Sequence, residues 1–158
     1  FTDPLTGLAN RTQFEEQVGR ALRRAQARAE AARGELPGHD AGDGDAAAGP
    51  GSLAVLVLDL DDFHSVNDGF GPMAGDRLLL GVAERMRRAT RGGDVVARLG
   101  GNTFALLLDG LAAPQDVTIV VGRLHAALHA PFHVADRPAL DGAAAARTVS
   151  VSARVGVA

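Results

Sequence analysis

Residues 58–68, which read LDLDDFHSVND, contain oxygen-bearing side chains that can bind a metal ion. Asp59 directly follows the apolar run LAVLVL, and a carboxylate at the carboxyl end of a buried strand faces the crevice in which open α/β sheets bind ligands. Carboxylate and backbone carbonyl oxygens suit Mg²⁺, which prefers hard oxygen donors and substrate phosphates. Asp59 is therefore a candidate metal ligand, although an Asp that ends a strand is, taken alone, more often a turn former.

Two glycine-containing segments follow, and each has a simple interpretation as well as a functional one. GFGPMAGD at 69–76 leads into a helix, in which Gly75 would let the backbone bend and Asp76 would cap the helix. RLGGNTF at 98–104 is a hairpin signal, whose two glycines allow positive φ and close approach of the backbone to a ligand. Taken separately, helix capping and an ordinary turn explain both segments.

Hydrophobic periodicity predicts the helices and strands that must position these segments. Apolar residues recur at three- and four-residue spacing in the helices, and continuous or alternating apolar runs mark the strands. Helices are expected at 12–33, 74–90 and 114–129, and strands at 53–60, 94–98, 104–108, 131–135 and 147–158. The run LAVLVLDL is typical of a central strand buried on both faces. This order of elements is an α/β plan with an inserted hairpin.

The composition is that of a soluble chain of 158 residues suited to one domain, with 46% hydrophobic and 22% charged residues. The absence of Cys excludes disulfides, and a net charge of −3 provides no basic field for nucleic acid. No apolar run reaches the roughly 18–20 residues of a membrane span, and no signal peptide is present, so we expect a cytoplasmic protein. Residues 34–52 are expected to form a flexible low-complexity loop, whose Asp40, Asp43 and Asp45 lack the spacing of a calcium site.

Five motifs resemble, in order and spacing, the GGDEF domain of the diguanylate cyclase superfamily. They are DPLTGLANR at 3–11, LDLDDFHSVND at 58–68, GD at 75–76, GGNTF at 100–104 and SVSARVGVA at 150–158. The resemblance implies an α/β fold with a central, mostly antiparallel sheet of about five strands flanked by helices, like the palm of nucleotidyl cyclases. It also implies that residues 1–158 are a single domain without the family's final helix. Because the chain opens with Phe1 and not Met, we expect it to be part of a longer multidomain protein.

Active members of the family join two GTP molecules into cyclic di-GMP across a dimer, with the help of two divalent metal ions. By resemblance, the carboxylate of Asp59 and the carbonyl of Leu60 bind metal. Asn67 and Asp76 match the pair that reads the guanine edge, since Asp accepts from N–H groups and Asn both donates and accepts. The remaining nucleotide-binding positions, by the same resemblance, are Asp62, Phe63, His64, Gly100 and Gly101.

The chain departs from the family pattern where catalysis depends on it. The replaced positions are Asn102 and Thr103, which are acids in the family's hairpin, His64, which is normally Lys, and Pro72, which is normally His. We therefore assign no catalytic residue. Asp59, with Asp61 nearby, is the remaining acid for Mg²⁺, whose binding we expect to be possible but weakened.

Arg91 and Asp94 lie upstream of the hairpin at the interval where the family carries its RxxD inhibitory site for cyclic di-GMP. A simple surface ion pair near a helix end is the alternative. We expect a degenerate, inactive domain that binds cyclic di-GMP or GTP as a regulatory module beside a domain such as an EAL phosphodiesterase, with a homodimer as a further expectation. The competing hypotheses are a weakly active diguanylate cyclase and a dimerisation module without ligand.

Overall fold

The computed structural model describes residues 1–34, 51–137 and 145–158. The predicted low-complexity loop at 34–52, with its three Asp residues, lies outside the described residues apart from its ends. At those ends Gly34 closes the first helix and Ser52 opens the first strand.

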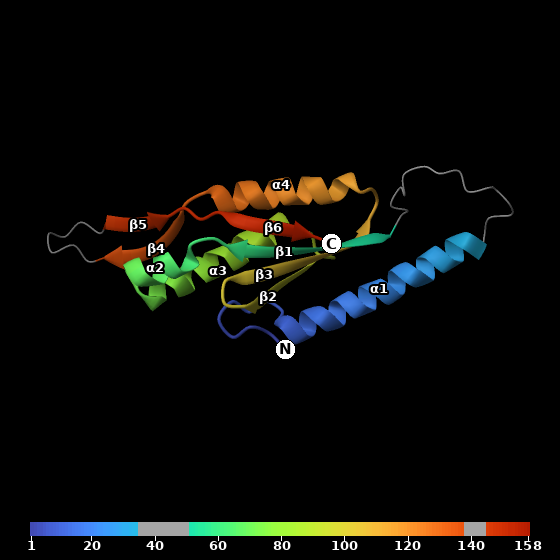
Figure 1. The fold of residues 1–158 in the computed structure, drawn as a ribbon, viewed down its shortest axis with the longest axis horizontal. Coiled ribbons are helices and arrows are strands. Elements are labelled where there is room, and N and C mark those ends of the chain that lie inside the picture. Colours follow the sequence, from blue (N-terminus) through green and yellow to red (C-terminus); the bar gives the residue numbers. More distant parts are fainter. Residues whose placement is uncertain (35–50, 138–144) are drawn as a thin grey trace.

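The described chain forms a main antiparallel sheet, a separate strand pair and four helices. In chain order the elements are α1 (Arg11–Gly34), β1 (Ser52–Leu60), α2 (Phe63–Phe70), α3 (Pro72–Ala89), β2 (Val95–Gly100), β3 (Thr103–Leu111), α4 (Gln115–His129), β4 (Phe132–Arg137), β5 (Ala145–Val149) and β6 (Ala153–Val157). The main sheet has the order β2-β3-β1-β6, and β4 pairs with β5. Helix α1 runs past the β2 side of the sheet and α4 past the β6 side (Figure 1). No helix in these ranges is long and apolar enough to cross a membrane.

Two apolar cores, one on each face of the main sheet, hold the helices in place. The larger core packs α3 and α4 against the face of β1 that carries Ala54, Leu56, Leu58 and Leu60. The smaller core packs α1 against the opposite face, through Phe14, Ala21, Ala97, Ala105 and Leu107.

Strand β1 is covered on both faces only over its first half. Leu53 and Val55 pack against the α1 core, whereas Val57 and Asp59, on the same face, are exposed. The prediction of a strand buried on both faces is therefore wrong for the second half, because α1 packs against the first half alone. This opening leaves the side chain of Asp59 accessible.

The predicted last strand at 147–158 is two strands that belong to two sheets. β5 ends at Val149 and β6 begins at Ala153. The side chain of Val151 is buried in the larger core, and the carbonyl of Ser152 accepts a hydrogen bond from the Asp61 N–H at 2.8 Å, so the chain changes sheets here. Among the described residues the main sheet therefore has four strands and not about five.

The helices differ from the prediction around residues 63–76. Helix α2 was not predicted, because only Val66 of its residues is buried and the run Asn-Asp-Gly within it has low helix propensity. Helix α3 begins at Pro72. Proline is well tolerated in the first turn, because an N–H at that position has no partner within the helix. Asp76 consequently lies in the second turn of α3 and does not cap it, which corrects the capping interpretation.

Candidate functional site

Asp59 lies near the end of β1 between two neighbouring strands. It is directly opposite Thr103 on β3 and Arg154 on β6, so the three side chains form a row across the sheet. The Thr103 hydroxyl donates a hydrogen bond to Asp59 Oδ1, with 2.6 Å between the oxygens. The residue that replaces a family acid is thus bonded to the predicted metal-binding carboxylate.

The second replacement residue is bonded to the second predicted metal ligand. Asn102 Nδ2 donates to the carbonyl oxygen of Leu60 at 2.7 Å, and the Leu60 N–H donates to the Asn102 carbonyl at 3.2 Å. We call Asp59, Leu60, Asn102 and Thr103 the hairpin half of the site. In this half, the Asn102 amide N–H points at the Leu60 carbonyl oxygen and the Thr103 O–H points at Asp59 Oδ1. These are two of the oxygens that a cation would bind.

Asp61, the other nearby acid, is also engaged. Its carboxylate accepts from Arg154 Nε at 2.8 Å and from the Ser152 hydroxyl at 3.0 Å. Asp61 is thus paired with Arg154 and Ser152, and its availability to a metal remains a prediction. No group of three or more His, Cys, Asp or Glu side chains in the described ranges is arranged to hold a metal ion. The donor set at Asp59 and Leu60 does not fit the divalent cation that the family implies.

The predicted guanine-reading residues meet where α2 packs on α3. The Asn67 side chain lies against Gly75, because a Cβ built at Gly75 would be only 1.8 Å from Asn67 Oδ1. Gly75 therefore permits close contact within a helix, and the predicted bend is wrong. Asp76 is the next residue along α3 and is exposed. We call Asn67, Gly75 and Asp76 the helix half of the site.

Asn67 carries an unsatisfied polar atom. Its Oδ1 is buried and, within the described part of the chain, has no hydrogen-bond partner. Such groups are rare in folded proteins and are costly when they stay unpaired. The helix half therefore differs from the hairpin half, in which Asp59 Oδ1 and the Leu60 carbonyl oxygen both accept hydrogen bonds.

The loop between β1 and α2 carries the predicted phosphate-contacting amides. Asp62 has a positive φ of 54° and precedes α2, whose first turn has no side-chain cap. Phe63 packs against the larger core, whereas His64 is exposed and lies 3.7 Å from Asp68, measured from Nε2 to Oδ2. The first N–H groups of α2 are thus left without a partner from a capping side chain.

Arg98 anchors the hairpin to the N-terminal segment, which the sequence analysis missed. We call the contacts of Arg98 with Asp3 and Gly101 the latch. Arg98 donates to the Gly101 carbonyl, at 2.8 Å from Nη2, and pairs with Asp3 at 3.1 Å from Nη1. Gly100 and Gly101 have φ of 137° and 54°, so the turn requires glycine. Burial alone would raise the pKa of Asp3, but hydrogen bonds from Thr6 and Arg98 outweigh it and keep this pKa below its usual value. The only sequence signal for this contact is that Asp3 lies in one of the family motifs and Arg98 just before another, and these two motifs are far apart in the chain.

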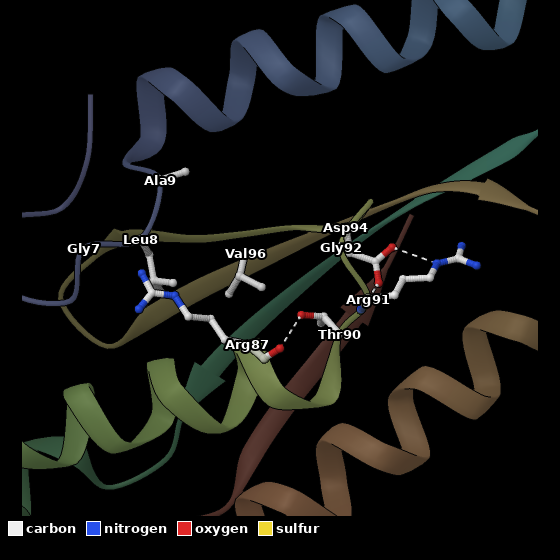
Figure 2. Close-up of a pocket in the computed structure, with 9 residues that line it drawn as sticks. All are labelled: Gly7, Leu8, Ala9, Arg87, Thr90, Arg91, Gly92, Asp94 and Val96. Carbon is white, nitrogen blue, oxygen red and sulfur yellow. Dashed lines mark hydrogen bonds and ion pairs between the residues drawn. The ribbon is translucent and has the colours of Figure 1, made fainter.

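The predicted inhibitory-site residues lie at a separate cleft of about 330 Å³. Arg91 Nε donates to Asp94 Oδ1 at 3.2 Å and its backbone N–H to Oδ2 at 3.1 Å, with the Asp94 side chain fully buried. Figure 2 shows Arg87 pointing toward Gly7 and Leu8, while the Arg91 guanidinium points the other way. The structure brings Arg91 and Asp94 together and adds Arg87, which the sequence analysis missed, as a cleft-lining cation.

Comparison with known proteins agrees with this architecture. The family model described as "Diguanylate cyclase, GGDEF domain" matches residues 45–150. The chain is 36% identical over 156 residues to diguanylate cyclase TpbB of Pseudomonas aeruginosa, covering 99% of this chain but 29% of that protein. It is also 36% identical over 155 residues to the cyclic di-GMP phosphodiesterase NbdA of the same species, covering 98% of this chain and 16% of NbdA.

Among solved structures, the GGDEF domain of TpbB from Pseudomonas aeruginosa has a TM-score of 0.75 and 35% identity, covering 99% of this chain and 74% of that one. A sensory box/GGDEF family protein from Caulobacter crescentus has a TM-score of 0.73 and 30% identity, covering 99% and 81%. This chain thus spans less than a third of the full length of TpbB and most of its isolated domain. It belongs to the GGDEF domain family and is homologous to diguanylate cyclases.

Proposed function

We propose that this domain is a non-catalytic, guanine-nucleotide-binding regulatory module of cyclic di-GMP signalling. One observation carries the proposal: Asn102 and Thr103 donate hydrogen bonds to Leu60 O and Asp59 Oδ1, the two predicted metal ligands. Joining two GTP molecules depends on cations that neutralise the developing phosphate charge. Since metal catalysis is worth several kcal/mol, and each ~1.4 kcal/mol is about tenfold in rate, its loss would leave little cyclase activity.

The helix half supports guanine binding. Guanine presents N1–H and N2–H donors, for which the exposed Asp76 carboxylate is a suitable acceptor. The neighbouring Asn67, whose Oδ1 is buried against Gly75, can donate to a guanine acceptor through its amide N–H groups. The uncapped amides at Asp62 and Phe63, at the start of α2, are suitable donors for a phosphate.

The Arg91–Asp94 cleft supports a second ligand, cyclic di-GMP. Arg91 pairs well with guanine and phosphate acceptors, and Arg87 adds a second cation to the cleft lining. Binding there would exchange the internal Arg91–Asp94 bond for ligand contacts.

The relatives suggest the setting of this module. NbdA is a cyclic di-GMP phosphodiesterase, and MucR of Pseudomonas aeruginosa is a bifunctional diguanylate cyclase/cyclic di-GMP phosphodiesterase. We infer that this domain likewise signals to a neighbouring domain such as an EAL phosphodiesterase, either as one copy or as a homodimer.

Calorimetry and product analysis test the proposal. Heat on adding GTP should be abolished by Asp76→Ala but not by Asp68→Ala, an exposed acid on the neighbouring helix. Heat on adding cyclic di-GMP should be abolished by Arg91→Ala but not by Arg88→Ala, an exposed Arg paired with Glu84. Incubation with GTP and Mg²⁺ or Mn²⁺ should yield no cyclic di-GMP on chromatography. The proposal is wrong if neither ligand binds, and the cyclase alternative holds if product forms.

A further inference from the structure

We infer that the nucleotide site works without a divalent cation and therefore favours guanine nucleotides with few phosphate charges, such as GMP, over GTP. This inference rests on the proposed function, because it concerns the same site. It differs from loss of catalysis, since an inactive site could still bind Mg²⁺ together with GTP.

Hydrogen-bond donors already contact the two oxygens that are predicted to bind the cation. Asn102 Nδ2 and Thr103 Oγ1 come from adjacent residues of one hairpin and reach Leu60 O at 2.7 Å and Asp59 Oδ1 at 2.6 Å. A cation approaching these oxygens would meet the positive ends of an N–H and an O–H bond. A metal ion that binds Asp59 Oδ1 and the Leu60 carbonyl would therefore compete with both donors.

The hairpin that carries these donors is anchored to its surroundings. Arg98 binds the Gly101 carbonyl and the carboxylate of Asp3, and its side chain is only 13% exposed. The backbone N–H of Leu60 also donates to the Asn102 carbonyl. The hairpin backbone that carries the two donors is therefore held by contacts to Arg98 and to Leu60.

Arg154 brings a positive charge to the strand beside Asp59. Arg154 lies directly opposite Asp59 on the neighbouring strand and binds Asp61 through Nε at 2.8 Å. Its guanidinium neutralises Asp61 and repels a cation near Asp59. The row of Thr103, Asp59 and Arg154 contains one acid and one base, whereas a two-metal site needs several acids.

The absence of a bound cation would affect how strongly the site binds the phosphates of a nucleotide. Without a cation, each added phosphate charge meets the exposed carboxylate of Asp62, whose own amide is one of the predicted phosphate donors, and the exposed carboxylate of Asp59 three residues earlier. The position of the family's Lys in this loop is occupied by His64. Arg154, which is already paired with Asp61, does not neutralise the negative charge of a triphosphate. Affinity should therefore come from guanine contacts and should fall from GMP to GDP to GTP.

The experiment is calorimetric titration of the whole chain with GMP, GDP and GTP, in Mg²⁺ and again in EDTA. For the natural sequence we expect the GMP affinity to equal or exceed that for GTP, with no change between Mg²⁺ and EDTA. The double variant Asn102→Asp/Thr103→Glu should gain GTP affinity of about 10–100-fold in Mg²⁺ alone. The single variant Asn102→Asp provides a milder test if the double variant is unstable.

A second readout does not need nucleotide. In electron paramagnetic resonance with Mn²⁺ alone, the natural sequence should leave the free-ion signal unchanged, and Asn102→Asp/Thr103→Glu should reduce it. The inference is overturned if the natural sequence depletes free Mn²⁺, or if Mg²⁺ raises its GTP affinity about tenfold. If no nucleotide binds at all, the proposed function fails, while the Mn²⁺ measurement still decides whether the cation site is closed.

Discussion

The two halves of the nucleotide site differ in how their polar groups are satisfied. In the hairpin half, Asp59 and Leu60 already accept hydrogen bonds from Thr103 and Asn102. In the helix half, Asn67 Oδ1 is buried without a partner among the described residues. The hairpin half is therefore held by hydrogen bonds between its own residues, whereas the helix half retains a polar atom that is unpaired within the described ranges.

Family membership alone would not reveal this difference. Both halves lie in motifs that match the family in order and spacing. The distinction emerges only from which atoms are hydrogen-bonded to which, and substitutions in either half test it.

The largest expected effect comes from removing the latch behind the hairpin half. Asp3→Ala should lower the free energy of unfolding by about 3 kcal/mol, because it leaves the nearly buried Arg98 without its ion partner. Urea denaturation measures this loss. As a control, Asp68→Ala removes an acid that is 70% exposed, and should change stability by ~0.5 kcal/mol or less. Equal losses in the two variants would mean that the latch has no special role.

The same latch should make stability depend on pH in the acidic range. The pKa of Asp3 is held below its usual value, so the unfolded chain binds this proton more readily than the folded one. The stabilisation by Asp3 is therefore complete above the unfolded pKa and is lost as pH falls through the folded pKa. In urea titrations, the gap between the natural sequence and Asp3→Ala should stay constant near neutral pH and shrink below about pH 4. A gap that widens on acidification would contradict this sign.

Gly75→Ala should damage the helix half. Its Cβ would lie 1.8 Å from Asn67 Oδ1, so the amide must rotate away. We expect a loss of about 1–2 kcal/mol in unfolding free energy, together with at least about tenfold weaker guanine-nucleotide binding.

Gly122→Ala on α4 is the matched control for Gly75→Ala. A Cβ at this helical glycine meets nothing within 4 Å, so the substitution should be neutral or stabilising by up to ~1 kcal/mol. If Gly75→Ala behaves in the same way, the close contact between α2 and α3 is not needed.

Thr103→Val removes one donor of the hairpin half while keeping the shape of the side chain. The lost hydrogen bond to Asp59 should cost about 1 kcal/mol of stability, measured by urea denaturation. Thr148→Val, at an exposed position on β5, should cost less. GMP binding should be unchanged, because the guanine contacts lie in the other half. Weaker GMP binding would mean that the two halves are not independent.

The smallest effect on stability is expected for Arg154→Ala. The Arg154 side chain is 83% exposed, so its ion pair with Asp61 should contribute only ~0–1 kcal/mol. Calorimetry should nevertheless show a larger loss of affinity for GTP than for GMP, because the variant adds net negative charge beside the phosphate amides. An equal loss for both nucleotides would show that Arg154 acts through the structure of the loop.

Much of the fold could be predicted from periodicity, and part could not. The helices at 12–33 and 114–129 and the strands at 53–60, 94–98 and 104–108 are confirmed to within a few residues, because each has a strong apolar pattern. Helix α2 was missed because it buries only Val66. The split of 147–158 was missed because alternation continues through Val151 while the chain changes sheets. The roles assigned to Asn67, Asp76, Arg91 and Asp94 remain predictions.

The sequence by itself determined the family, the positions of the motifs and the loss of both hairpin acids, since these are properties of residue type and spacing. Only the tertiary structure decided which atoms the replacement side chains bind. Thr103, Asp59 and Arg154 are far apart in the chain and become neighbours through strand pairing. Whether an Asn or Thr beside an acid binds a metal or closes its site depends on where its hydrogens point, and the packing of the hairpin against β1 sets that direction.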